Sequence, residues 1–274
     1  MMHHTLIQPE SAARNLLREL KVKSIEDLWD IELLAYYRNA LVRYARLDGA
    51  EARLSAVGRK AIITVSDKPT NLARKRFSIA HELGHFEIHC LDDGLEICTG
   101  RDIDIWNKGA QSREQEANIF ASAFLMPQPF FEPLCNQEIP SLDLIAQLSV
   151  HFRTSLTATA LRYSYFCSEP VAVIYSQNGR AQWFKSNQPF SELGVYIETR
   201  ARLDERTFAA RSLDASRYYV PGKVPALAWF AKGSYRRDAT IVEHSWPLQP
   251  YDGVLTLLWV DDDLYDEQDE FLWG

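Results

Sequence analysis

The segment His81-Glu82-Leu83-Gly84-His85 constrains this chain more than any other feature of its sequence. Apolar side chains recur around it at helical spacing, as expected for an amphipathic helix; they are Phe77, Ile79, Ala80, Phe86 and Ile88. Residues i and i+4 of a helix lie one above the other on one face, so both imidazoles can converge on one divalent ion. The sequence therefore predicts a metal site built on a helix that also packs against a core.

The pattern HExxH also places a carboxylate where it can take a proton from a metal-bound water. Zinc lowers the pKa of a bound water toward neutrality, and Glu82 lies one step round the helix, within reach of that water's proton. Gly84 removes a side chain where another element must approach closely. The alternative is a helix whose two histidines are ordinary core or surface groups. The position of the motif inside a helix that follows a strand favours the metal site.

A catalytic zinc ion needs a third protein ligand and one open position. His89 shares the helical face of His85. It lies two turns from His81, about 12 Å along the axis, so one ion cannot bind all three histidines in an unbroken helix. His89 is therefore expected beside the site or on the surface.

Two acids on the next predicted helix are better candidates for the third ligand. Glu114 and Glu116 differ by about 200° around a helix, so only one of them can face the ion. Asn118 shares a face with Glu114 and can hydrogen-bond a ligating imidazole. Glu114 is therefore the preferred ligand and Glu116 the runner-up, with a solvated helix position as its ordinary interpretation.

The order of predicted elements indicates an α+β fold. Helical patterns flank β-like residues 41–66, which fit a short three-stranded sheet. After Pro170 strands dominate, beginning with a hairpin at Asn178-Gly179, because Asn-Gly suits a type I′ turn. The predicted organisation is a helix-dominated domain, a smaller β-rich domain and an acidic tail, at residues 1–168, 169–260 and 261–274.

The distribution of charge argues against nucleic-acid binding. Residues 261–274 hold seven of the 37 acidic residues and no Lys or Arg, which leaves 30 charges of each sign in the rest of the chain. A neutral body lacks the basic footprint of a nucleic-acid binder. Residues 149–164 resemble part of a helix-turn-helix, but only Arg153 and Arg162 are basic there, so a packing helix pair is the better interpretation.

Targeting signals and cysteine usage both favour the cytoplasm. The N-terminus does not have the pattern of a secretory signal, and no apolar run reaches the length that spans a bilayer. None of the four cysteines forms a CxxC pair. Free thiols in a reducing compartment are therefore expected, and a cysteine-based zinc site is disfavoured.

The residues RFSIAHELGHF, at 76–86, followed by EQEANIFASAFLMP, at 114–127, resemble the ImmA/IrrE family of metallopeptidases. The resemblance is strong over residues 60–127 and extends more weakly over 24–165. It implies a gluzincin-like α+β peptidase core with a small antiparallel sheet. It also implies a role for each of four residues: His81, His85 and Glu114 as zinc ligands, and Glu82 as general base.

The resemblance further implies the class of substrate. Members of the family are associated with cleaving helix-turn-helix repressors of mobile elements or stress regulons. The expected function is thus an intracellular zinc endopeptidase that relieves repression, with no direct contact to nucleic acid or membrane. The alternative is a non-catalytic, zinc-containing interaction module, antitoxin-like or anti-repressor, that acts by binding a protein partner.

Two further features are relevant to peptide cleavage. The strand predicted at residues 60–66 pairs with an extended substrate if it lies at the edge of its sheet. A Tyr or His often steadies the oxyanion in zinc peptidases; His151, Tyr163 and Tyr165 are candidates, although a structural role is the more ordinary interpretation of each.

Overall fold

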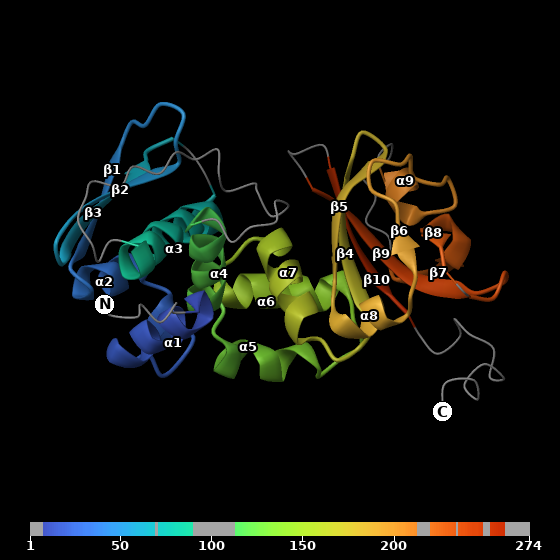
Figure 1. Ribbon diagram of the computed structural model, residues 1–274, viewed down its shortest axis with the longest axis horizontal. Coiled ribbons are helices and arrows are strands. Elements are labelled where there is room, and N and C mark those ends of the chain that lie inside the picture. Colours follow the sequence, from blue (N-terminus) through green and yellow to red (C-terminus); the bar gives the residue numbers. More distant parts are fainter. Residues whose placement is uncertain are drawn as a thin grey trace, which may run out of the picture. The chain divides into compact units, whose positions relative to one another are not determined.

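The computed structural model describes residues 8–68, 71–89, 113–212, 220–233, 235–248 and 253–260. The chain divides into two compact units (Figure 1). Unit 1 comprises the residues up to 131 together with 149–155, and unit 2 comprises 132–148 and the residues from 156 onward. The described elements confirm the predicted α+β class, whereas the domain limit at residue 168 stays a prediction. No helix among the described residues is both long and apolar enough to cross a membrane.

Unit 1 combines helices with one small sheet. Its helices are α1 (Pro9–Glu19), the 3-10 turn η1 (Glu26–Leu28), α2 (Ile31–Tyr37), α3 (Leu72–His89) and α4 (Arg113–Leu125). Asn71 accepts a hydrogen bond from the backbone N–H of Arg74 at 2.8 Å and so begins α3. The buried helix faces and the sheet share one apolar core, which includes Leu16, Leu54, Ile63, Leu83 and Phe120.

The segment before the sheet forms two short helical elements, η1 and α2. The Asp27 carboxylate accepts from the backbone N–H groups of Lys23 and Ser24, which closes the 3-10 turn. Asp30 then caps α2 by accepting from Leu33 N at 2.9 Å. Two local carboxylates therefore keep this segment from forming one continuous helix.

The sheet of unit 1 contains β1 (Ala40–Ala45), β2 (Ala52–Val57) and β3 (Lys60–Ser66) in the order β1-β3-β2. β2 and β3 form the antiparallel hairpin, whereas β1 pairs parallel to β3. The predicted strand at residues 60–66 is β3, the central strand of this sheet, and both of its sides are paired, so the condition for pairing with a substrate is not met. β2 lies at the edge of this sheet and packs against α3.

Helix α3 is buried around its whole circumference in the middle of unit 1. Arg76 and all residues from Ser78 to Phe86 are buried. The Arg76 guanidinium donates to the carbonyls of Leu28, Trp29 and Arg153 at 2.9, 2.7 and 3.2 Å. Buried polar groups need such partners, so Arg76 fixes the helix to two neighbouring segments of unit 1.

Gly84 is the point of closest approach between α3 and α4. A methyl group on Gly84 would lie 2.9 Å from Cδ1 and 3.1 Å from Cβ of Phe120, which is fully buried. The expectation that Gly84 makes room for another element is thus explained by the Phe120 ring. Close packing here brings the polar face of α4 to the histidines of α3.

Unit 2 is organised around an antiparallel sheet with the order β5-β4-β10-β9-β7. The predicted Asn178-Gly179 hairpin is confirmed, with φ values of 52° and 68° at its two central residues. The strands are β4 (Val171–Gln177), β5 (Arg180–Ser186), β7 (Gly222–Pro225), β9 (Thr240–Leu248) and β10 (Gly253–Trp259), and the short pair β6 (Tyr196–Ile197) and β8 (Phe230–Lys232) lies apart. The remaining elements are α7 (Leu156–Phe166), α8 (Gln188–Glu192), α9 (Phe208–Ser212) and η3 (Ala226–Ala228). Two helices, α5 (Gln128–Cys135) and α6 (Leu142–Phe152), contribute residues to both units.

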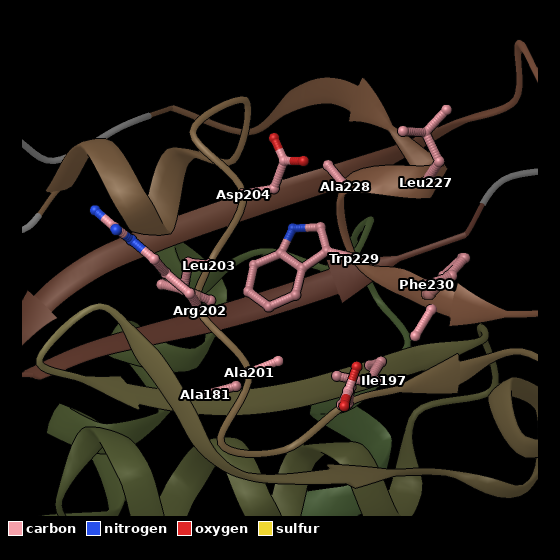
Figure 2. A pocket seen from close by; sticks show the side chains of 12 residues that line it. Ala181, Ile197, Ala201, Arg202, Leu203, Asp204, Leu227, Ala228, Trp229 and Phe230 are labelled. Atoms are coloured by element: carbon pink, nitrogen blue, oxygen red, sulfur yellow. The ribbon is translucent and has the colours of Figure 1, made fainter.

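A pocket of about 190 Å³ lies in unit 2, with the indole of Trp229 at the centre of its lining (Figure 2). The indole Nε1 donates to the buried carboxylate of Glu243 at 2.9 Å. That carboxylate also accepts from Ala209 N and Ser245 Oγ, both at 2.7 Å, and so ties α9 and the wall of the pocket to β9. Among the described residues, the one group of side chains able to hold a metal ion lies elsewhere, in unit 1.

Both described cysteines, Cys135 and Cys167, are free and buried, in agreement with the prediction of free thiols. Burial raises the pKa of the Cys135 thiol to about 12 and also raises that of Cys167, so both are unreactive at neutral pH. Cys90, Cys98 and the acidic tail lie outside the described residues.

Candidate metal centre

The structure brings the three predicted zinc ligands together. His81 and His85 come from the buried middle of α3, and Glu114 comes from the first turn of α4. One ligand atom from each of these residues lies within 4.8 Å of the other two. The two histidine side chains are only 2% and 1% exposed, and that of Glu114 is 25% exposed. The cluster is thus walled by protein on the side of α3 and more open on the side of the glutamate.

The distances within the cluster lie within a few tenths of an ångström of those between the ligands of a tetrahedral zinc ion. The His81 Nε2 atom lies 3.1 Å from Glu114 Oε2 and 3.1 Å from His85 Nε2, and His85 Nε2 lies 3.3 Å from Glu114 Oε1. Bonds of about 2.0–2.2 Å place the ligands of a tetrahedral zinc ion about 3.3–3.6 Å apart. The donor set, two imidazoles and one carboxylate, is one that zinc commonly takes in catalytic sites. The residues therefore fit this ion in both chemistry and spacing.

Asn118 lies against the first of these histidines, on the face of α4 that it shares with Glu114. Its Oδ1 atom lies 2.9 Å from His81 Nδ1, and both residues are buried. An amide oxygen only accepts, so Nδ1 carries the proton and Nε2 presents its lone pair to the cluster. A histidine that binds a metal through Nε2 requires this tautomer.

Burial and the contacts within the cluster shift the pKa values of His85 and Glu114. Burial lowers the pKa of His85, so its imidazole is neutral near pH 7. Burial by itself would raise the pKa of Glu114, but the adjacent imidazoles of His81 and His85 outweigh it and hold that pKa far below its ordinary value. Three lone-pair donors this close repel one another unless a cation lies between them. The cluster is therefore arranged to receive a positive ion.

Glu82 lies on α3 between the two ligand histidines and is 3% exposed. A carboxylate is rarely buried to this degree in the absence of a specific role or partner. Its place in the motif next to His81 is the one that the general base of a metallopeptidase occupies.

His89 and Glu116, the other two candidate ligands, lie next to the cluster but do not belong to it. His89 Nδ1 lies 2.9 Å from His85 Nδ1, and His89 Nε2 lies 2.8 Å from Glu116 Oε2. The sequence predicts His89 beside the site or on the surface but not its contact with Glu116. The i, i+4 spacing of His85 and His89 was a usable signal, but the position of Glu116 depends on how α4 packs.

The candidates for oxyanion stabilisation gain no support. His151 is exposed on α6 and its ring lies edge-on to Phe152. The Tyr163 side chain is fully buried and its hydroxyl accepts from the Cys167 thiol, whereas Tyr165 is 68% exposed. Their proposed role stays a prediction.

Comparison with known proteins agrees with this geometry. Residues 35–164 match the family of IrrE N-terminal-like domains, Peptidase_M78. A stretch of 103 residues is 31% identical to the radiation response metalloprotease IrrE of Deinococcus radiodurans; it covers 38% of this chain and 30% of that protein. Among solved structures, a Mycobacterium tuberculosis transcriptional regulator superposes with a TM-score of 0.54 at 19% identity, over 94% of this chain and 77% of that one, which shows a shared fold.

The family match contains every residue of the cluster, from His81 and Glu82 to Glu114 and Asn118. It ends before β4, so the sheet of unit 2 lies outside it. Over residues 35–164 the chain is therefore similar to the IrrE N-terminal-like domains of the Peptidase_M78 family.

Proposed function

We propose that this protein is a zinc-dependent endopeptidase. The observation that carries the proposal is the spacing of 3.1–3.3 Å among ligand atoms of His81, His85 and Glu114. The buried Glu82 carboxylate within the same helical segment supplies the base that hydrolysis needs. The match to a metallopeptidase family supports the same conclusion.

The proposed reaction divides its tasks between the ion and the protein. A zinc ion held by the three ligands supplies Lewis acidity, which polarises a peptide carbonyl and acidifies water. Glu82 takes a proton from the attacking water and passes it to the leaving amine. Asn118 keeps His81 in the tautomer that binds metal, and Glu114 contributes the negative charge of the ligand set.

The proposed substrate is a helix-turn-helix transcriptional repressor, whose cleavage in the cytoplasm relieves repression. The family resemblance supports this substrate class, and the fold shared with a transcriptional regulator is compatible with a role in gene control. On the protein itself, β2 is the sheet edge that packs beside α3. An extended peptide can pair with such an edge, which brings its backbone to the helix that carries Glu82.

Two measurements test the proposal. Purified protein should contain about one zinc ion per chain, and it should cleave a repressor encoded beside its gene. The Glu82→Gln variant keeps the ligand set, so it should retain zinc and lose cleavage. Cleavage at the wild-type rate by Glu82→Gln would refute the role of Glu82, and absence of zinc binding by the wild-type protein would refute the whole proposal.

The same variant separates catalysis from the alternative, a non-catalytic module that controls its partner by binding. The sheet of unit 2 lies outside the family match, and its edge strand β5 has exposed positions. If Glu82→Gln protein relieves repression in cells and leaves the repressor intact, binding rather than proteolysis is the function.

A further inference from the structure

We propose that Glu116 and His89 are positioning residues that hold His85 in its metal-binding tautomer and thereby strengthen metal binding. The inference rests on the metal site proposed above. It assigns roles to two residues that the ligand set leaves unused.

The contacts form a continuous path from α4 to the ligand atom. Glu116 Oε2 lies 2.8 Å from His89 Nε2, and His89 Nδ1 lies 2.9 Å from His85 Nδ1. The other nitrogen of His85, Nε2, lies 3.3 Å from Glu114 Oε1 within the cluster. Each histidine in this path therefore uses both of its ring nitrogens.

The proton positions along this path follow from what each atom can do. An ionised carboxylate only accepts hydrogen bonds, so Glu116 requires a proton on His89 Nε2. With that proton on Nε2, the 2.9 Å contact between the two Nδ1 atoms needs one donor and one acceptor, and the tautomer that serves both contacts has His89 Nδ1 accepting and His85 Nδ1 donating. The proton of His85 thus lies on Nδ1, and the lone pair of Nε2 faces the cluster. In the opposite tautomer, a proton would occupy the place of the metal bond.

Burial strengthens the preference of His85 for the tautomer protonated on Nδ1. The side chains of His85 and His89 are 1% and 6% exposed, and that of Glu116 is 21% exposed. In such a site little water competes for the Nδ1 atoms, and an unpaired donor is costly. The ring of His85 is also clamped in the orientation that the hydrogen bond requires.

Residues of α4 orient both ligand histidines, one directly and the other through His89. Asn118 accepts from His81 directly, and Glu116 acts on His85 through the His89 ring. Residues 114, 116 and 118 of α4 thus supply one ligand and two orienting groups. An acidic group at the end of a histidine path also raises the basicity of the ligating nitrogen.

The test measures zinc affinity by competition with a chromophoric chelator, in full-length protein. His89→Phe keeps a ring but removes the acceptor, and Glu116→Leu removes the carboxylate; each should weaken zinc binding about tenfold to hundredfold. Glu116→Gln retains an acceptor oxygen and should recover most of that loss. Glu87→Gln is the matched control, because it neutralises another largely buried acid of the same helix pair, one that contacts Arg38. Its zinc affinity should equal that of wild type.

A second readout separates positioning from a general structural effect. Long-range proton–nitrogen NMR of the metal-free protein reports which nitrogen of His85 carries the proton. Wild type and Glu116→Gln should show the proton on Nδ1, whereas His89→Phe should show it moved to Nε2. Because Glu116→Gln is nearly isosteric, it reports on the site even if the larger changes fail to fold.

The outcomes distinguish this inference from the proposed function. If wild-type protein binds zinc, and folded His89→Phe and Glu116→Leu bind it equally tightly with the His85 proton unmoved, the positioning role is wrong and the peptidase proposal stands. A wild-type His85 protonated on Nε2 also overturns the inference alone. If wild-type protein binds no zinc, both proposals fall together.

Discussion

Replacement of Gly84 by alanine tests whether the packing of α3 on α4 sets the geometry of the metal site. The added methyl group would lie 2.9 Å from Phe120 Cδ1, whereas carbon atoms in contact prefer about 3.5–4.0 Å. Phe120 is fully buried and stacks on Phe124 with their ring centroids 5.7 Å apart, so it has little room to retreat. We therefore expect α4 to move away from α3 by a fraction of an ångström up to about 1 Å.

Two opposing contributions determine how Gly84→Ala changes the free energy of unfolding. Alanine gains about 1 kcal/mol over glycine in a helix interior. Insertion of a methyl group into a packed core costs about 1–3 kcal/mol. The net effect on the free energy of unfolding is then a loss of about 0–2 kcal/mol. The metal site is more sensitive, because Glu114 moves with α4 while both histidines stay on α3, and a displaced ligand lowers zinc affinity by about tenfold or more.

The assay is chelator competition for zinc, together with urea unfolding of the metal-free chain, for three proteins. Gly84→Ala should lose zinc affinity out of proportion to its loss of stability. The double variant Gly84→Ala with Phe120→Leu removes the ring that causes the clash, so it should regain zinc affinity relative to Gly84→Ala. Unchanged zinc affinity in Gly84→Ala, or no recovery in the double variant, would refute the reasoning that helix spacing controls the site.

Three more changes test separate parts of the molecule. Arg76→Met leaves three backbone carbonyls without their charged donor, and should lower the free energy of unfolding by roughly 2–4 kcal/mol in urea titrations; an unchanged midpoint would contradict its role. Asn118→Ala removes the acceptor for His81, and should weaken zinc binding about tenfold in chelator competition, with cleavage falling in parallel. Burial raises the pKa of Glu243 above 4.5, so its contribution to stability is full below pH 4.5 and declines as the pH rises through the raised value. Urea titrations from pH 4 to 8 should show this decline in wild type but not in Glu243→Gln, which is less stable at every pH because its amide faces a donor; parallel curves would disprove the assignment.

The sequence by itself determined the features that depend on neighbours along the chain. The HExxH segment forms a helix, Asn71 caps it, and Asn178-Gly179 turns a hairpin, because each is decided by local periodicity, capping or turn chemistry. The same local reasoning placed His81 and His85 on one face. It also reduced the third ligand to a short list of acids on the following helix.

Only the tertiary structure revealed which side chains contact these acids. The sequence favoured Glu114 over Glu116 because Asn118 shares its helical face, yet the contact of Glu116 with His89 depends on how far α4 slides along α3, which Phe120 fixes against Gly84. The central position of β3 and its parallel pairing with β1 likewise join segments that turn chemistry does not connect. These features arise from contacts between residues remote in sequence, whose energies depend on the packed arrangement and not on any local pattern.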